Sequence, residues 1–342
     1  MYSIRVKWKT FVGRLLLIGI VLCCSAICAT RVESLSRQAA VMHASLHAPV
    51  PIPLPSDLAI PHYDPGPPPF RSGETLVYEA SWIGIPAAEA RIVLLNSGAA
   101  SRSWTGKLWL RSSAAVDLVY RMRDYIDEDF NRGDLRPREM HILQHEKQRR
   151  DEWSVRFNDR EHLVTSVKRN MQGRTWVREF SGGEPWGPFS GAMLALSLPL
   201  TVGETYTFDV FSGGNRYVLA FTVDKRESVM TPLGTLRALR ILPSIVWLSE
   251  GKFLNQVSKM VVWVSDDERH LPLKIEATAF IGSISIDLHQ VLNAPGPTIA
   301  AAAIQQTPAV QSERFVPLLA PTLADTIMAL NYRDMVLLNT RG

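Results

Sequence analysis

The sequence predicts an all-β fold: a curved antiparallel sheet that closes into a barrel or a clam-like two-sheet structure, with one short helical insertion near residues 189–198. Apolar and polar residues alternate in short runs between residues 70 and 293, and alternate residues of a strand point to opposite faces. Turn-forming residues separate the runs. The runs are too numerous for a flat open sheet, so the sheet must curl or fold over to cover its apolar face.

The first element is a leader, residues 1–29. Four bases and no acid stand before the apolar run Leu15–Ala29. This run is shorter than the roughly 20 residues that a membrane-spanning helix needs. A cleaved signal peptide, with export to the periplasm, is therefore the favoured interpretation. The alternative is an uncleaved inner-membrane anchor formed by residues 11–29.

The leader also contains the whole excess of positive charge and all the cysteines. The chain of 342 residues has 37 Lys and Arg against 33 Asp and Glu, and the four leader bases account for the net charge of +4. The rest of the chain is neutral by count, which argues against a nucleic-acid-binding protein. Cleavage after Ala29 leaves no cysteine for a disulfide, a thiolate nucleophile or a zinc site.

Two loose segments flank the expected β-domain, residues 70–293. Residues 30–69 are rich in proline, which favours a stiff polyproline II linker over a helix or a central strand. Residues 294–342 begin with Pro-Gly-Pro and an alanine run. They are expected to form a flexible C-terminal tail with room for one short helix.

Within the β-domain the clearest alternating runs are expected to be strands. Residues 187–200 break the pattern because they are apolar on every side and lie between two prolines, which predicts a short buried helix. A faint internal echo, Gly-Glu-Thr at residues 73–75 and again at 203–205, stands before two of the runs. The six alternating runs expected to be strands are Leu76–Trp82, Trp153–Phe157, Tyr206–Val210, Tyr217–Val223, Leu271–Ala277 and Ile284–Leu288.

No catalytic residue, metal site or cofactor is predicted. His141 and His145 stand four apart, but on a strand followed by several bases, which favours surface histidines over a metal pair. Asp127 and Asp129 share one strand face, where a solvated strand end is favoured over a calcium site. Ser190 lies in Gly-Pro-Phe-Ser-Gly, which lacks the spacing of a nucleophile elbow.

Aromatic residues provide the candidate ligand-binding positions. By alternation, five of them are expected on the inward face of the sheet. An aromatic interior is either a filled core or a cavity for an apolar ligand, and the sequence does not separate the two. The five residues are Trp82, Trp153, Tyr206, Phe208 and Trp263.

Several segments together resemble a family of exported bacterial proteins, domain of unknown function 3108 (DUF3108). The likeness covers about residues 70–292 and departs from the family near residues 193–197, where the family has a more polar turn that contains arginine. It implies a periplasmic, mostly antiparallel β-structure and no assigned activity. The segments are Gly73–Tyr78, Trp82–Pro86, Leu110–Ser113, Tyr120–Asp124, Val202–Glu204, Thr231–Thr235 and Val262–Lys274.

Three functional hypotheses follow. The first is a non-enzymatic periplasmic protein of the cell envelope that binds an apolar or lipid-like ligand. The second is a structural or interaction module with a filled core, and the third is a hydrolase of unrecognised type. A lipid or envelope component is the expected partner, with no nucleic acid, a monomer by default, and membrane contact only through an uncleaved leader.

Overall fold

The computed structural model describes residues 50–51, 60–96, 102–247, 257–279 and 282–293. The chain divides into two compact units, residues 1–304 and 305–342, and every described residue belongs to the first. The expected leader, the expected C-terminal tail and most of the proline-rich segment lie outside the described residues. In the part of the chain that is described, no helix is both long enough and apolar enough to cross a membrane.

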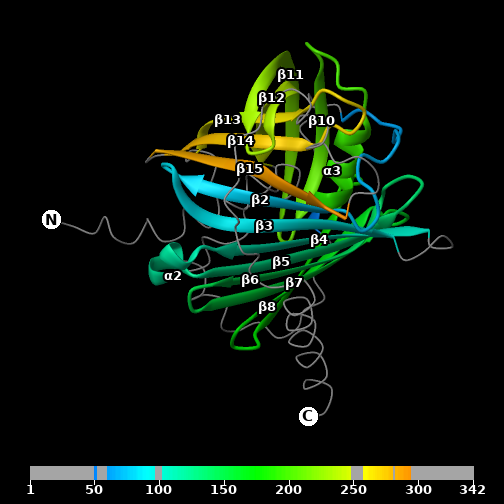
Figure 1. The fold of residues 1–342 in the computed structure, drawn as a ribbon. Coiled ribbons are helices and arrows are strands. Elements are labelled where there is room, and N and C mark those ends of the chain that lie inside the picture. Colours follow the sequence, from blue (N-terminus) through cyan, green and yellow to red (C-terminus); the bar gives the residue numbers. More distant parts are fainter. Residues whose placement is uncertain (1–49, 52–59, 97–101, 248–256, 280–281, 294–342) are drawn as a thin grey trace. The chain divides into compact units, whose positions relative to one another are not determined.

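The described residues form one large sheet with two short helices (Figure 1). The helices are α2 (Ala114–Tyr120) and α3 (Pro188–Ser197). The strands are β1 (Val50–Pro51), β2 (Thr75–Trp82), β3 (Ile85–Asn96), β4 (Ser103–Ser112), β5 (Met122–Asn131), β6 (Pro137–Glu146), β7 (Arg149–Asn158), β8 (Leu163–Asn170), β9 (Thr175–Ser181), β10 (Thr205–Ser212), β11 (Asn215–Thr231), β12 (Gly234–Trp247), β13 (Val257–Ser265), β14 (Pro272–Ala279) and β15 (Ser283–Leu292).

The sheet consists of two series of hairpins joined in the middle. Its order is β1-β9-β8-β7-β6-β5-β4-β3-β2-β15-β14-β13-β12-β11-β10. All neighbours pair antiparallel except β1, which pairs parallel with β9. The expected all-β antiparallel sheet is confirmed, whereas closure into a barrel is not, because β10 and β1 are the two free edges of the order.

The two ends of the strand order nevertheless meet through side chains and one bridging residue. The Phe180 ring on β9 lies 4.9 Å from the Phe211 ring on β10, in an edge-on arrangement. Trp186, in the connection from β9 to α3, forms a parallel bridge with Val210 on β10. The Ser166 hydroxyl on β8 donates to the carbonyl of Gly213 in the β10–β11 turn. In Figure 1 the strands β10–β12 run steeply to β3–β8, and α3 lies near β10.

Part of the expected linker packs on the β-domain. The Tyr63 ring stacks on Phe208 at 5.1 Å, and its hydroxyl accepts a hydrogen bond from the N–H of Thr207 at 2.9 Å. The two-residue strand β1 also lies in this segment. It occupies the sheet edge, where a proline is tolerated because its missing N–H breaks no ladder. The expectation of an unpaired spacer is therefore corrected for these residues.

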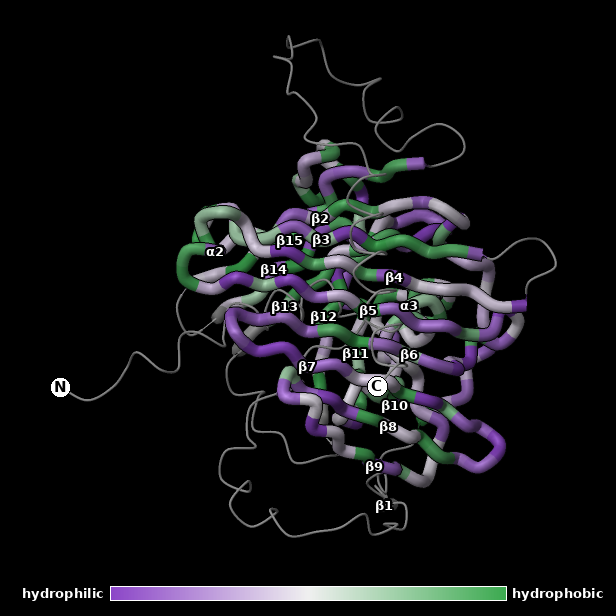
Figure 2. The backbone as a smooth tube through the Cα atoms, turned by 90° about the horizontal axis from the view of Figure 1, so that it is seen from below, coloured by the Kyte–Doolittle hydropathy of each residue, from purple (hydrophilic) through white to green (hydrophobic). Residues whose placement is uncertain are grey.

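Strand alternation places the core on one face of the sheet. On β5 the residues Met122, Asp124, Ile126, Glu128 and Phe130 are buried, and those between them are partly exposed. Polar and apolar colours alternate in the same way along the strands of Figure 2. Two of the five inward residues of β5 are acids, a point that matters for the site described below.

The Gly-Glu-Thr echo corresponds to a repeated local structure. Gly73 and Gly203 both have a left-handed backbone, with φ of +80° and +92°. The N–H of Gly73 donates to the carbonyl of Leu94, and the N–H of Gly203 to that of Val223, both at 2.8 Å. Each glycine thus turns the chain into a strand while it bonds to the next strand.

The expected helical insertion is confirmed as α3, one residue earlier than predicted. A second helix, α2, was not expected. Ser113 begins it, and the hydroxyl of Ser113 accepts a hydrogen bond from the N–H of Val116 at 3.4 Å, the usual role of serine at a helix N-cap.

Candidate functional site

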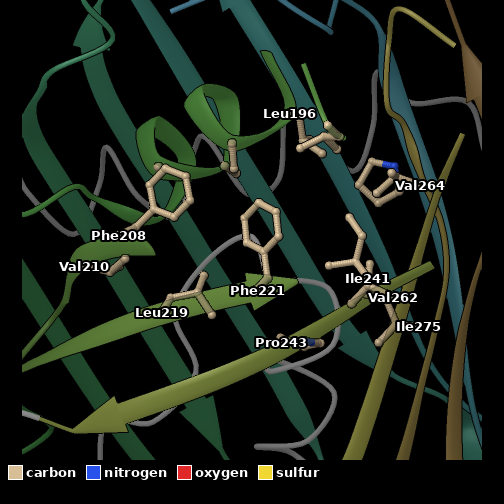
Figure 3. A pocket seen from close by; sticks show the side chains of 15 residues that line it. Leu196, Phe208, Val210, Leu219, Phe221, Ile241, Pro243, Val262, Val264 and Ile275 are labelled. Atoms are coloured by element: carbon tan, nitrogen blue, oxygen red, sulfur yellow. The ribbon is translucent and has the colours of Figure 1, made fainter. Parts of the chain in front are cut away.

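The candidate site is an apolar pocket between α3 and the strands β10–β14 (Figure 3). Its cavity volume is about 50 Å³, and the empty space around it, open solvent included, is about 700 Å³. No titratable side chain lines it. The lining residues are Gly191, Ala192, Ala195, Leu196, Leu200, Phe208, Val210, Leu219, Phe221, Ile241, Pro243, Val262, Val264, Pro272 and Ile275.

Two phenylalanine rings form one wall of the pocket. Phe208 on β10 and Phe221 on β11 stack with their ring centres 5.7 Å apart and their planes 11° apart. Figure 3 shows Leu196 of α3 above them and Ile241, Val262 and Ile275 to one side. Aromatic and branched aliphatic walls favour an apolar guest, because every contact removes apolar surface from water.

The first turn of α3 is held by a buried carboxylate from another strand. Glu128 on β5 accepts hydrogen bonds from the N–H groups of Phe189, at 2.6 Å, and Ser190, at 3.0 Å. These are two of the N–H groups that lack a partner within the helix. A carboxylate is favourable here because the helix dipole leaves its N-terminus partly positive.

Two glycines make room for this contact. Gly106 lies directly opposite Glu128 in the β4–β5 ladder, and a Cβ at Gly106 would lie 2.5 Å from the Phe189 ring. A Cβ at Gly187, just before α3, would lie 2.3 Å from a Glu128 oxygen. The first turn of α3 therefore packs directly against the backbone of β4.

Burial raises the pKa of Glu128 from its ordinary value of 4.5 to about 7, although the hydrogen bonds from Ser190 and Phe189 act in the opposite direction. The side chain is fully buried, and an ionised carboxylate loses its hydration there. Near neutral pH this carboxyl group consequently exists in both protonation states.

The last turn of α3 is fixed by two further contacts. The Ser197 hydroxyl accepts a hydrogen bond from the N–H of Gly66 at 3.1 Å. Nδ1 of His270, in the β13–β14 turn, lies 2.9 Å from the carbonyl oxygen of Leu196, and it donates to that oxygen when it carries the proton. Both ends of the helix that roofs the pocket are thus attached to other parts of the domain.

Of the five aromatic residues expected on the inward face, the structure brings two together at the pocket. Phe208 lines it, and Tyr206 stacks on the lining residue Phe221 at 5.3 Å. Trp153 is buried in the core on β7, with the Lys168 ammonium 4.9 Å from its ring centre. Trp82 packs against the core at the end of β2. Neither tryptophan lines the pocket.

The inward orientation expected for Trp263 is wrong. Its neighbours on β13, Val262 and Val264, line the pocket, so Trp263 points to the opposite face. There its indole N–H donates to Glu227 at 2.8 Å. In a run of Val-Trp-Val the alternation gives the period but not which face is inside.

The sequence reasoning missed Glu128. It lies between Asp127 and Asp129, and the three acids together resemble a solvated strand end. The alternation from Met122 to Phe130 was the signal that could have found it, because this period places Glu128 on the apolar face. A buried acid without a basic partner needs another source of hydrogen bonds, and α3 provides it.

A second buried acid, Asp124, lies on the same strand face outside the pocket. One of its carboxylate oxygens accepts from the N–H of His145 at 3.0 Å, and the other has no hydrogen bond. Burial, together with the nearby charge of Glu146, raises the pKa of Asp124 well above its usual value. The side chain therefore favours the neutral form in the folded protein.

The other polar candidates do not form a reactive centre. Ser190 is buried, and its hydroxyl donates to the carbonyl of Gly187 at 3.3 Å. His141 lies on β6 with Nδ1 3.2 Å from the Ser154 hydroxyl. Among the residues that the structure describes, no group of three or more His, Cys, Asp or Glu side chains is placed to hold a metal ion.

Comparisons with known proteins identify a family and some distant structural likenesses. The family model for a protein of unknown function, DUF3108, matches residues 77–289, more than half of the chain. No curated protein matches the sequence.

Three solved structures are similar in part. A β-barrel-like protein of domain of unknown function DUF1849 from Brucella abortus has 8% identity and a TM-score of 0.43, over 64% of this chain and 96% of that one. A protein from Bacteroides fragilis, described as exported and with a YmcC-like fold, has 7% identity and a TM-score of 0.30, over 67% and 99%. A protein from Parabacteroides distasonis described as a lipoprotein has 8% identity and a TM-score of 0.31, over 65% and 95%.

Proposed function

The chain belongs to the DUF3108 family, and from that premise we propose that it is an exported, non-enzymatic β-domain protein of the cell envelope that binds an apolar ligand in the pocket under α3. The ligand is an acyl chain or a similar apolar group of an envelope lipid. The domain acts as a monomer, and the leader directs it to the periplasm.

The composition of the pocket supports this proposal. All of its lining residues are apolar or glycine, and they come from one helix and five strands. The cavity under α3 is about 50 Å³, well below the roughly 300–1,000 Å³ of pockets that bury a drug-sized ligand. The pocket therefore suits the end of an acyl chain rather than a whole lipid molecule.

The same composition favours binding over catalysis. General acid–base or nucleophilic chemistry needs a polar group within hydrogen-bond reach of the reacting atoms. The pocket walls offer no side chain of this kind. Glu128 is committed to the backbone of α3 and does not line the pocket.

A fluorescent fatty acid tests the proposal. The full chain is expected to bind it and to release it to unlabelled fatty acid. Ala195 lines the pocket from α3, so the variant Ala195→Phe fills the pocket and is expected to weaken binding at least about tenfold, the effect of losing about 1.4 kcal/mol. Leu219→Gln, which places an amide in the wall, is a second variant with the same expected direction.

Ala114→Phe is the matched control, because Ala114 is exposed on the other helix and the added ring is the same. It should bind like the unaltered chain. Native mass spectrometry of protein purified from its own envelope adds a second readout, in which co-purifying lipid supports the proposal. Bare protein in repeated preparations, together with equal binding by Ala195→Phe, would leave a structural module with a filled core as the better reading.

A further inference from the structure

One end of the sheet carries exposed apolar residues on two neighbouring elements. Strand pairing brings the β2–β3 turn, α2, the β6–β7 turn and the β8–β9 turn to this same end. The pairs that fix it are Trp82 with Ile85, Ala88 with Ser112, Arg111 with Arg123, Met122 with Glu146, Glu146 with Arg149, and Asp151 with Asn170.

The β2–β3 turn places an isoleucine where local chain physics disfavours one. Ile83 and Gly84 both have a left-handed backbone, with φ of +52° and +74°. Two-residue turns of this kind favour Asn-Gly, because a β-branched side chain is strained at positive φ. Ile83 is 54% exposed and its neighbour Ile85 58% exposed. Burial in the core therefore does not account for either residue.

Helix α2 presents two more apolar side chains beside this turn. Leu118 is 88% exposed and Val119 67% exposed. The hydroxyl of Ser113, at the start of α2, donates to the carbonyl of Pro86 at 2.9 Å, which ties the helix to the beginning of β3. Figure 1 shows α2 at this end of the sheet, and Figure 2 shows its apolar colouring. We call Ile83, Ile85, Leu118 and Val119 the apolar tip.

The turns that follow the apolar tip in the strand order are basic. Residues 112–123, 146–151 and 169–174 contain seven bases and three acids. At the opposite ends of the same strands, residues 71–74, 131–137, 158–163 and 182–184 contain four bases and five acids. The bases near the tip are Arg121, Arg123, Lys147, Arg149, Arg150, Arg169 and Arg174. The surplus of positive charge is thus at the same end as the exposed apolar side chains.

Two of these bases are fixed next to α2. Arg121 follows the helix directly and is exposed. Its carbonyl accepts a hydrogen bond from the N–H of Lys147 at 2.8 Å. The Lys147 ammonium lies 5.5 Å from the ring centre of Tyr120, the last residue of α2. The acids in these turns have partners, since Asp117 pairs with Arg123, Asp151 pairs with Arg149, and Glu146 accepts from the Tyr120 hydroxyl.

From these observations we propose that this end of the sheet docks on the surface of an anionic lipid bilayer. The apolar tip enters the boundary between headgroups and acyl chains, and the arginines and Lys147 of the neighbouring turns meet the lipid phosphates. Apolar residues flanked by bases are the composition of interfacial membrane-binding segments. A second copy of this chain fits less well, because a two-fold contact would place the bases of one copy against those of the other.

Docking is a separate property from the pocket, and either one can fail without the other. The full chain is incubated with vesicles of phosphatidylcholine alone and with vesicles of equal parts phosphatidylcholine and phosphatidylglycerol. Binding is expected to be stronger to the anionic vesicles and to weaken with added salt, as for electrostatic attraction. In the vesicle-bound protein, amide hydrogen exchange is expected to slow at residues 82–88 and 112–121. This result is expected even where another segment of the chain also contacts lipid.

Two variants separate docking from folding. Leu118→Glu/Val119→Glu is expected to reduce binding to the anionic vesicles at least about tenfold, because it replaces inserted apolar groups with charges that the phosphates repel. Ile83→Asn is expected to weaken binding severalfold while the melting temperature stays equal or rises, because asparagine tolerates the left-handed backbone.

Met230→Glu is the matched control, since Met230 is 78% exposed at the β11–β12 turn, away from the tip turns. It should bind anionic vesicles like the unaltered chain. The proposal is overturned if the tip variants bind vesicles as the unaltered chain does. It is equally overturned if exchange slows elsewhere but not at the tip, or if the variants change only self-association.

Discussion

Glu128 attaches a titratable carboxyl group to the first turn of α3. Its carboxylate bonds to two N–H groups of α3, yet it is buried without a basic partner, and its pKa is raised to about 7. The folded chain therefore keeps a proton that the unfolded chain releases near pH 4.5. Stability that depends on this proton is complete below pH 4.5 and is lost as the pH rises toward 7.

Replacement of the acid should flatten this pH dependence. Between pH 4.5 and 7 the Glu128 carboxyl is expected to lower the free energy of unfolding by roughly 3 kcal/mol, at about 1.4 kcal/mol for each unit of pKa shift. Glu128→Gln removes the ionisation, so urea unfolding between pH 4 and 8 should show a smaller slope. Glu139→Gln on β6, where the acid is half exposed, should keep the original slope. A slope left unchanged by Glu128→Gln would contradict the assignment.

The residues that escaped sequence reasoning share a physical cause. Alternation reports the period of a strand but not the direction of its inner face, and Trp263 was placed on the wrong side because both faces of β13 are apolar. Glu128 was read with its acidic neighbours as solvated, since its partner α3 lies some 60 residues away in the chain. Phe208 and Tyr206 were expected on the inward face of the sheet, and of the two Phe208 lines the pocket.

At the scale of elements, α3 depends on the absence of a side chain on β4. Gly106 lies under Phe189, and a Cβ there would come within 2.5 Å of the ring. A glycine inside a strand weakens that strand unless something packs closely against its backbone. In this protein α3 supplies the close contact, so Gly106 allows α3 to pack on the sheet at the expense of a side chain on β4.

Gly106→Ala is therefore expected to destabilise the domain by about 1–3 kcal/mol, the usual effect of overpacking a core. Gly133→Ala, in the β5–β6 turn, is the control, because a Cβ there meets nothing within 4 Å. Chemical unfolding of the two variants at one pH measures the difference. Equal stability of both would show that α3 can shift away from β4 without loss.

Elements were predictable where the pattern is local. The strong alternation and the apolar segment between two prolines gave the antiparallel strands and α3. Helix α2 was missed because its seven residues are too few to display a helical period, and it carries exposed Leu118 and Val119 where a surface helix usually has polar residues. The edge strand β1 was missed because its pairing with β9 uses only two residues, one of them a proline.

At the scale of the whole domain, one long-range ladder joins the two series of hairpins. β2 pairs with β15 from Trp82 with Ile284 to Thr75 with Leu292. No local pattern predicts this pairing, because the two strands are separated by roughly 200 residues. The sequence accordingly predicted a sheet that closes into a barrel or a clam-like structure, but it did not indicate which strands lie at the centre of the sheet.

Removal of β15 should abolish folding. A chain that ends at residue 282 leaves β2 and β14 with unpaired edges in the middle of the sheet, and exposed edges promote aggregation. A chain that ends at residue 304 keeps the whole first unit and serves as the control. Thermal melting and size-exclusion chromatography compare the two. A cooperative melt of the chain ending at residue 282, like that of the control, would contradict this role of β15.

The pairing of β2 with β15 delays the completion of the sheet in a newly synthesised chain. The hairpins from β2 to β9 can form as soon as their residues are available, but the free edge of β2 waits for the last strand of the domain. At synthesis rates of about 5–20 residues per second, roughly 200 residues correspond to about 10–40 seconds. During that interval the unpaired edge of β2 can pair with other strands or other chains. Folding therefore depends on how this edge is protected until β15 has been synthesised.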